Sequence, residues 1–260
     1  MQHKKAVNII GWIIATLTTL LYTFTQYPTI SFWDGAEFAT TSSTLQISHP
    51  PGATFFQLLG SIIPITYLSP LFSGLSVMML YYICVYVLSR FSQMYPGIIT
   101  SSIIGALTFA VLDSQWFCAN ETDVYPLSLL LSLLSIWLTI KWTQTHRVNY
   151  LILICLILGL SLCVHQLTLL SLPAICLIIY FDKRKTNFKG ALLYLFISLL
   201  LIVLIQFLLP IFLIWILSEY AILKIIIFSL ILAFLIVVAY KKSKPILLYT
   251  ILGLIFLIIG

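Results

Sequence analysis

Long apolar stretches separated by short polar ones run through the whole chain of 260 residues. A helix that crosses a hydrocarbon core of ~30 Å needs about 20 apolar residues, because each helical residue rises only about 1.5 Å. The pattern predicts about nine spans, at residues 6–25, 70–89, 98–113, 126–140, 149–163, 167–181, 190–217, 221–240 and 245–260. The expected fold class is therefore an all-α polytopic membrane protein, with residues 1–260 forming a single transmembrane domain.

The composition supports this class and excludes others. Hydrophobic residues make up 62% of the chain and charged residues only 8%, which is not the balance of a soluble domain. The net charge of +6 comes from basic residues in short clusters between the spans, so the expected partner is the lipid bilayer and not a nucleic acid. The five cysteines lack ligand spacing. We therefore predict no cofactor and no metal site, with a divalent metal left open.

The charges also predict which side each connection faces. With the N-terminus inside, twelve of the thirteen basic residues fall on the cytoplasmic side, as the positive-inside rule requires. The apolar run 151–181 fits this scheme only as two short helices with a turn near His165, which then faces a recess from outside. The predicted location is a plasma membrane, with the site facing the periplasm. The heavy use of Ile, Leu and Lys in the chain favours a bacterial membrane.

The longest external connection, residues 26–69, carries the first candidate chemistry. It is too apolar to lie free in water, so we expect short helices along the membrane interface. Asp34 and Glu37 are three residues apart and would share one helix face. We expect them to titrate as a coupled pair, one with a raised pKa, and to serve as a general base, a metal-ligand set or a hydroxyl-binding clamp. The simpler alternative is a helix start, where acidic residues are favoured.

The sequence His49-Pro50-Pro51-Gly52 follows in the same connection. Its two prolines disfavour helix, so it predicts a rigid turn that leads into a helix at Ala53. Such a turn beside a helix N-terminus suits an oxyanion or a phosphate. We therefore include His49, Pro50 and Gly52 among the substrate-binding candidates.

A second acidic group lies near residue 120. Glu121 and Asp123 are two residues apart, so they share a function only if the chain there is not regular helix. The alternative is a solvated loop before the next span. Tyr125, in the same segment, and His165 complete the substrate-binding candidates, although a histidine in a helical bundle is often only a packed polar residue.

Three segments together resemble a known family. The run TISFWDGAEFATTSSTLQISHPPGATFFQLLG is similar to the first external loop of membrane proteins that were long of unknown function and are related to protein O-mannosyltransferases. SQWFCANETDVYPLSLL and GLSLCVHQLTLLSLPA match further segments in the same order, so the resemblance covers residues 7–181.

The resemblance implies a GT-C glycosyltransferase fold that uses a polyprenyl-phosphate sugar donor. It also implies that Asp34 is the base, with Glu37 as its partner. Glu121 and Asp123 would match the family's second acidic pair, in which glutamate is commoner at the position of Asp123, and His165 would match the histidine of the third segment.

The function expected is transfer of a sugar, such as mannose, from that donor to a hydroxyl of a protein acceptor. The alternatives are a non-catalytic or degenerate assembly subunit of the same fold, and a lipid-carrier transporter or flippase. Residues 190–260 are expected to add spans that are cut short, as in a truncated family member.

Overall fold

The computed structural model describes residues 2–29, 34–49, 52–182 and 186–220, together with 222–224, 226, 227 and 230. Helices joined by turns make up these residues, and no strand occurs among them. In chain order the helices are α1 (Gln2–Phe24), α2 (Gly35–Thr44), α3 (Thr54–Ile62), the 3-10 helix η1 (Ile65–Tyr67), α4 (Leu68–Leu88), α5 (Tyr95–Ala110), α6 (Asp113–Asn120), α7 (Tyr125–Thr145), α8 (Val148–Leu162), the 3-10 helix η2 (Gln166–Ser171), α9 (Leu172–Phe181) and α10 (Phe188–Leu217). The all-helical fold class is confirmed for this part of the chain.

Four helical stretches are long and apolar enough to cross a membrane: Lys4–Phe24, Ile65–Leu88, Tyr125–Thr145 and Phe188–Ile216. A fifth span is possible if α5 and α6, which meet at a bend of 61°, count as one. The prediction of nine spans and of the GT-C fold is therefore not confirmed. Of the expected spans, 245–260 lies wholly and 221–240 mostly outside the described residues.

One connection differs from the structure predicted from the sequence, and one agrees with it. Residues 113–120, expected in an external loop, form helix α6. The run 151–181 does break near His165, because α8 ends at Leu162 and η2 begins at Gln166. That prediction is confirmed.

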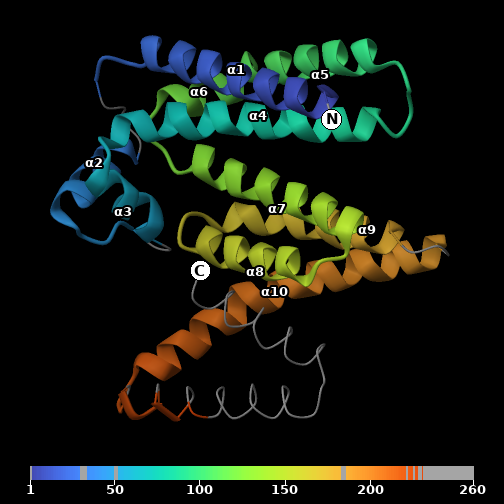
Figure 1. The fold of residues 1–260 in the computed structure, drawn as a ribbon. Coiled ribbons are helices and arrows are strands. Elements are labelled where there is room, and N and C mark those ends of the chain that lie inside the picture. Colours follow the sequence, from blue (N-terminus) through green and yellow to red (C-terminus); the bar gives the residue numbers. More distant parts are fainter. Residues whose placement is uncertain are drawn as a thin grey trace. The chain divides into compact units, whose positions relative to one another are not determined.

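The chain divides into two compact units, Met1–Trp137 with Ser161–Thr168, and Leu138–Leu160 with Leu169–Gly260. In the first, α1 lies along α4, and α4 lies along α5 (Figure 1). Tyr22 of α1 is fully buried in this core, and its hydroxyl donates to the carbonyl of Ala110 at 2.7 Å. The Tyr22 ring also meets Trp116 of α6 edge-on, so the bend between α5 and α6 is fixed against α1.

The contact between α1 and α4 depends on a glycine. A Cβ on Gly74 would lie 2.0 Å from Oγ1 of Thr19 and 2.8 Å from the carbonyl oxygen of Ala15, which is backbone and cannot turn away. We expect Gly74→Ala to push the two helices apart and to lower the stability by about 1–3 kcal/mol, the usual cost of overpacking. Thermal unfolding in detergent tests this, with Gly105→Ala as the control because nothing lies within 4 Å of a Cβ at Gly105. An unchanged melting temperature for Gly74→Ala would contradict the packing described.

Helices α2 and α3 pair with each other within the first unit (Figure 1). The rings of Phe38 and Phe56 meet edge-on at 5.7 Å, and both side chains are buried. Beside them, the Gln57 amide donates to Oγ1 of Thr41 at 2.7 Å. The short helices expected in 26–69 are thus present, while their position at the membrane interface stays a prediction.

In the second unit, α9 and α10 form a helical hairpin. Asn187 caps α10 by accepting from the Gly190 N–H at 2.7 Å, and the Tyr180 hydroxyl donates to the Asn187 carbonyl at 2.8 Å. The chain therefore reverses direction at Asn187. Pro210 lies inside α10.

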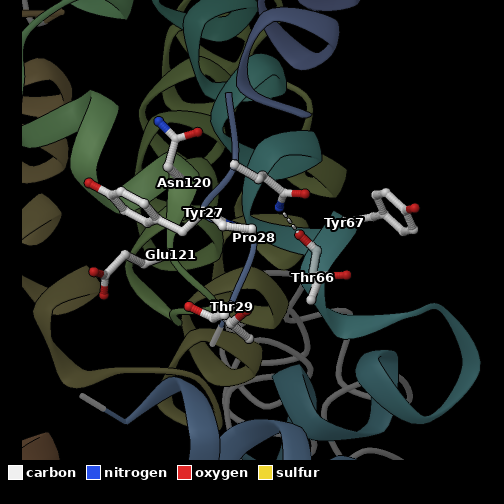
Figure 2. A pocket seen from close by; sticks show the side chains of 9 residues that line it. Tyr27, Pro28, Thr29, Thr66, Tyr67, Asn120 and Glu121 are labelled. Carbon is white, nitrogen blue, oxygen red and sulfur yellow. Dashed lines mark hydrogen bonds between the residues drawn. The ribbon is translucent and has the colours of Figure 1, made fainter. Parts of the chain in front are cut away.

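Two cavities lie among the connections of the first unit. The larger, of about 210 Å³, is shown in Figure 2, and its lining residues are Gln26, Tyr27, Pro28, Thr29, Thr66, Tyr67, Asn120, Glu121 and Thr122. The smaller, of about 100 Å³, is lined by Asp34, Phe38, Ser48, His49, Gly52, Ala53, Asp123, Val124, Tyr125, Val164 and His165. We call them the Glu121 cavity and the Asp34 cavity.

Candidate active site

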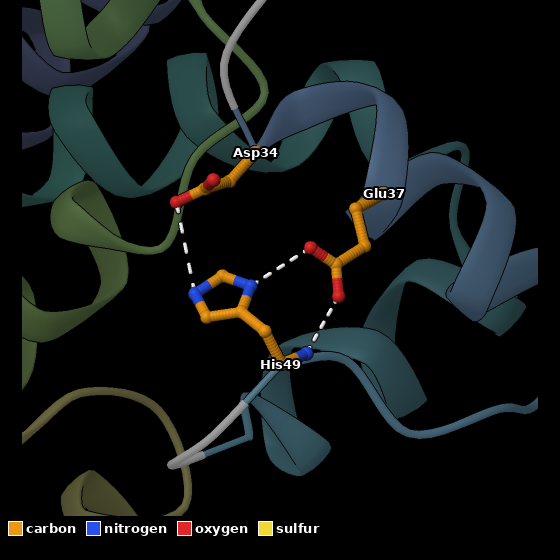
Figure 3. A group of neighbouring side chains, drawn as sticks. All are labelled: Asp34, Glu37 and His49. Atoms are coloured by element: carbon orange, nitrogen blue, oxygen red, sulfur yellow. Dashed lines mark hydrogen bonds and ion pairs between the residues drawn. The ribbon is translucent and has the colours of Figure 1, made fainter.

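His49 lies between Asp34 and Glu37 and contacts both carboxylates (Figure 3). Its Nδ1 is 2.8 Å from Oε2 of Glu37, and its Nε2 is 3.9 Å from Oδ2 of Asp34. The His49 backbone N–H also donates to the Glu37 carboxylate. The three side chains therefore form one group, in which Glu37 holds His49 and Asp34 lines the Asp34 cavity.

The charges of this group follow from its hydrogen bonds. The side-chain bond from His49 is the main reason that the pKa of Glu37 lies below its usual value, and the same bond raises the pKa of His49. Our expectation of two coupled carboxylates, one with a raised pKa, is therefore wrong for Glu37. An imidazole lies beside that carboxylate and favours its charged form.

The simpler alternative, a helix start, is confirmed in position, because Asp34 is the N-cap residue of α2 and Glu37 lies in its first turn. Asp34 occupies the N-cap position of α2, but its side chain makes no capping hydrogen bond. Its carboxylate points toward His49 instead (Figure 3). An aspartate that starts a helix without capping it is available for another role.

The turn predicted after His49 is present. The Gly52 N–H donates to the His49 carbonyl at 2.8 Å, and Gly52 has a φ of 81°, which glycine tolerates at no steric cost. Helix α3 begins two residues later, and its Phe55 N–H donates to the carbonyl of Cys163. His49 and Gly52 both line the Asp34 cavity, whereas Pro50 lies outside the described residues.

Asp123 reaches the same cavity from the connection between α6 and α7. Ser69, at the start of α4, fixes it by a hydroxyl that donates to the Asp123 carbonyl and accepts from the Asp123 N–H. Burial raises the pKa of Asp123 to about 6, and the negative charges of Asp34 and Glu121 act in the same direction. The carboxyl group with a raised pKa is therefore Asp123, and it titrates close to neutral pH.

Glu121 and Asp123 do not act on one cavity. The chain at 121–124 is not helical, as a joint role requires, but Glu121 lines the Glu121 cavity while Asp123 lines the Asp34 cavity. The two acids are thus brought to neighbouring cavities and not to a single site.

Tyr125 and His165 complete the wall of the Asp34 cavity. Their rings lie 5.1 Å apart, and a hydrogen bond of 2.8 Å between the hydroxyls of Ser128 and Thr168 ties the His165 turn to α7. Nδ1 of His165 accepts the Leu167 N–H, which leaves Nε2 to carry the proton of a neutral ring. Burial lowers the pKa of His165, so this ring is a neutral hydrogen-bond donor at physiological pH.

The same residues offer ligands for a cation. One ligand atom each from Asp34, Glu37 and His49 lies within 4.8 Å of the others, and two carboxylates with an imidazole suit a divalent ion. Among the described residues, no lysine or arginine lines the Asp34 cavity. A negatively charged ligand would have to rely on His49, His165 or such a cation.

Some residues that build the site carried no recognisable signal in the sequence. Ser69 was one of many hydroxyl residues near predicted span ends, and only the fold shows that it holds Asp123. The residues 26–29 and 66–67 gave no motif, although they line the Glu121 cavity. In the sequence, the one indication of the Glu121 cavity was Asn120, which lies next to the acidic pair.

The comparisons with known proteins agree with the resemblance noted above. Residues 34–188 match the family model described as the protein O-mannosyl-transferase TMEM260 N-terminal domain. The match covers more than half of the chain, so the chain belongs to this family. No curated protein and no solved structure matches it. The apolar helices and the family together identify a membrane protein and support a glycosyltransferase-like role.

Proposed function

We propose that the protein is an inverting membrane glycosyltransferase that moves a sugar, such as mannose, from a polyprenyl-phosphate carrier to a hydroxyl of a protein acceptor on the external face. The observation that carries this proposal is the convergence of Asp34, His49, Asp123 and His165 on one small cavity. They come from three separate connections of a chain that otherwise has few charges. Family membership supports the same chemistry.

In this mechanism Asp34 is the general base. Its free carboxylate oxygen takes the proton of the acceptor hydroxyl as that oxygen attacks the anomeric carbon. The bond from the anomeric carbon to the phosphate oxygen breaks, and the phosphate leaves with the electron pair. Asp123 accepts a hydrogen bond from a neighbouring N–H of the acceptor and so orients the acceptor hydroxyl, whose one proton goes to Asp34.

The leaving phosphate needs a positive or hydrogen-bonding partner. His49 is the strongest candidate, because Glu37 raises its pKa and so keeps it charged to higher pH. His165 adds a neutral donor through Nε2. Alternatively, a divalent ion held by Asp34, Glu37 and a neutral His49 would supply the positive charge in place of protonated His49. Loss of transfer on addition of EDTA, restored by Mg²⁺ or Mn²⁺, would demonstrate that requirement.

The transporter alternative finds less support. A transporter site is expected within broken spans, with its ionisable residues at mid-membrane depth. Asp34, Glu37, His49 and Asp123 lie in connections or in a short helix, outside the four long apolar stretches. Asp113, at the bend between α5 and α6, is exposed and lines neither of the two cavities.

The direct test is a transfer assay in membranes that contain the intact chain. Labelled sugar is offered on a polyprenyl phosphate or, in parallel, on a nucleotide, and incorporation into protein is measured. We expect label in protein only with the lipid-linked donor and only when the chain is present. Absence of transfer with every donor would favour the assembly-subunit alternative.

A further inference from the structure

The Glu121 cavity is a second site, distinct from the one described above. Three connections of the first unit line it: 26–29 after α1, 66–67 in η1, and 120–122 after α6 (Figure 2). Its floor is buried, since Asn120, Glu121 and Thr122 are 5%, 7% and 7% exposed. Its rim carries Tyr27 and Tyr67, which are about half exposed. The cavity of about 210 Å³ is smaller than the ~300–1,000 Å³ of drug-sized pockets, so it suits one small group.

Glu121 is the unusual residue of this cavity. Its side chain makes no hydrogen bond and no ion pair with any described residue, although it is more than nine-tenths buried. Its carboxylate oxygens are not among the fully buried polar atoms that lack a partner, so a ligand in the cavity can reach them. A carboxylate is an acceptor, so a ligand that binds it must supply a hydrogen-bond donor.

The remaining groups define what that donor can be. The Asn120 amide is held by Thr25 and by the Trp116 carbonyl, which fixes its position on the cavity floor. The Gln26 amide likewise donates to the Thr66 carbonyl. Within the described wall there is no lysine or arginine, so a phosphate is disfavoured. Hydroxyl groups on the wall can both donate and accept, and they are contributed by Tyr27, Thr29, Thr66, Tyr67 and Thr122.

We propose that the Glu121 cavity is a saccharide subsite that holds one hexose unit. Glu121 accepts hydrogen bonds from two ring hydroxyls of an uncharged sugar, and the Tyr27 and Tyr67 rings cover an apolar face at the rim. The proposal goes beyond transfer at the Asp34 cavity, because a chain without activity would still bind the sugar. Glu121 and Asp123 are two residues apart, at most about 7 Å of extended chain, so the two cavities are neighbours.

The test measures binding of methyl α-mannoside and methyl α-glucoside to the full chain in nanodiscs, by saturation-transfer NMR. We expect weak, saturable binding of at least one glycoside. Glu121→Gln should weaken it about tenfold or more, because it replaces a charged acceptor with a neutral one. Thermal unfolding verifies that the variant folds like the parent.

Two further variants separate the cavities. Asp34→Asn should bind the glycoside as the parent does, because Asp34 lines only the other cavity, and the exposed Glu219→Gln serves as the charge-matched control. The proposal is overturned if the parent binds no glycoside, or if Glu121→Gln binds as well as the parent. Binding that Asp34→Asn abolishes and Glu121→Gln retains would also overturn it, by assigning the sugar to the Asp34 cavity. Binding is measured without transfer, so these outcomes can be interpreted even if the proposed transfer reaction does not occur.

Discussion

Asp34→Asn is expected to lower sugar transfer by about 10²–10⁴-fold, the usual contribution of a general base. The substitution keeps the size of the side chain and replaces the basic carboxylate with an amide that cannot take up the acceptor proton. Its effect on folding should be small, because the Asp34 carboxylate caps no helix and is half exposed. The measurement is the initial rate of transfer from polyprenyl-phosphate sugar, at equal amounts of protein in the membrane.

Asp113→Asn is the matched control for this variant. It makes the same charge change at an exposed aspartate in the first unit, away from the lining of either cavity, and should transfer as the parent does. Glu37→Gln should have a smaller effect than Asp34→Asn, since Glu37 acts by holding His49. Equal activity of Asp34→Asn and the parent would remove Asp34 from the mechanism.

The features that could be predicted from the sequence are those encoded in local patterns. Hydropathy and span length indicated the helical class, and prolines with a glycine indicated the turn that closes between His49 and Gly52. The break near His165 followed from the need to keep two basic clusters on one side. The first two depend on residues within one span or one turn, and the third depends on the basic clusters at the two ends of one apolar run.

The features that could not be predicted depend on contacts between distant segments. The spacing of Asp34 and Glu37 suggested a carboxylate pair, but the imidazole between them comes from twelve residues further along. Likewise, the adjacency of Glu121 and Asp123 suggested one function, whereas the two residues line different cavities. Burial of Asp123 depends on the packing of α4 and α6, which no local pattern specifies.

The second large effect is expected in the pH dependence of transfer. Burial raises the pKa of Asp123 to about 6, and its proposed role requires the charged form. The kcat/KM of the parent should therefore rise about tenfold per pH unit below pH 6 and level off above it. Asp123→Asn should be much less active and should lose this acidic limb.

Two histidines in the same cavity also titrate, and each must be separated from Asp123. The pKa of His49 is raised, so its deprotonation affects the alkaline side of the profile. Burial lowers the pKa of His165, so this ring also titrates on the acidic side and His165→Gln is the necessary control. If His165→Gln loses the acidic limb and Asp123→Asn retains it, the limb does not belong to Asp123.

The same pKa shift predicts a gain in stability when Asp123 is replaced. A carboxyl group whose pKa is higher in the folded than in the unfolded protein destabilises the fold when ionised. This cost is complete above about pH 6 and disappears as the pH falls toward 4, below which both states are protonated. Asp123→Asn, which can still accept from the Val124 N–H, should therefore be more stable than the parent at pH 7.5 by about 1–3 kcal/mol.

The difference in stability should vanish near pH 4, and thermal unfolding at the two pH values in one detergent measures it. A variant that is less active and more stable would identify Asp123 as a residue whose burial serves the reaction at the expense of the fold. A variant that is less stable at both pH values would instead show that the Asp123 side chain is needed for the local structure, in which it accepts from the Val124 N–H.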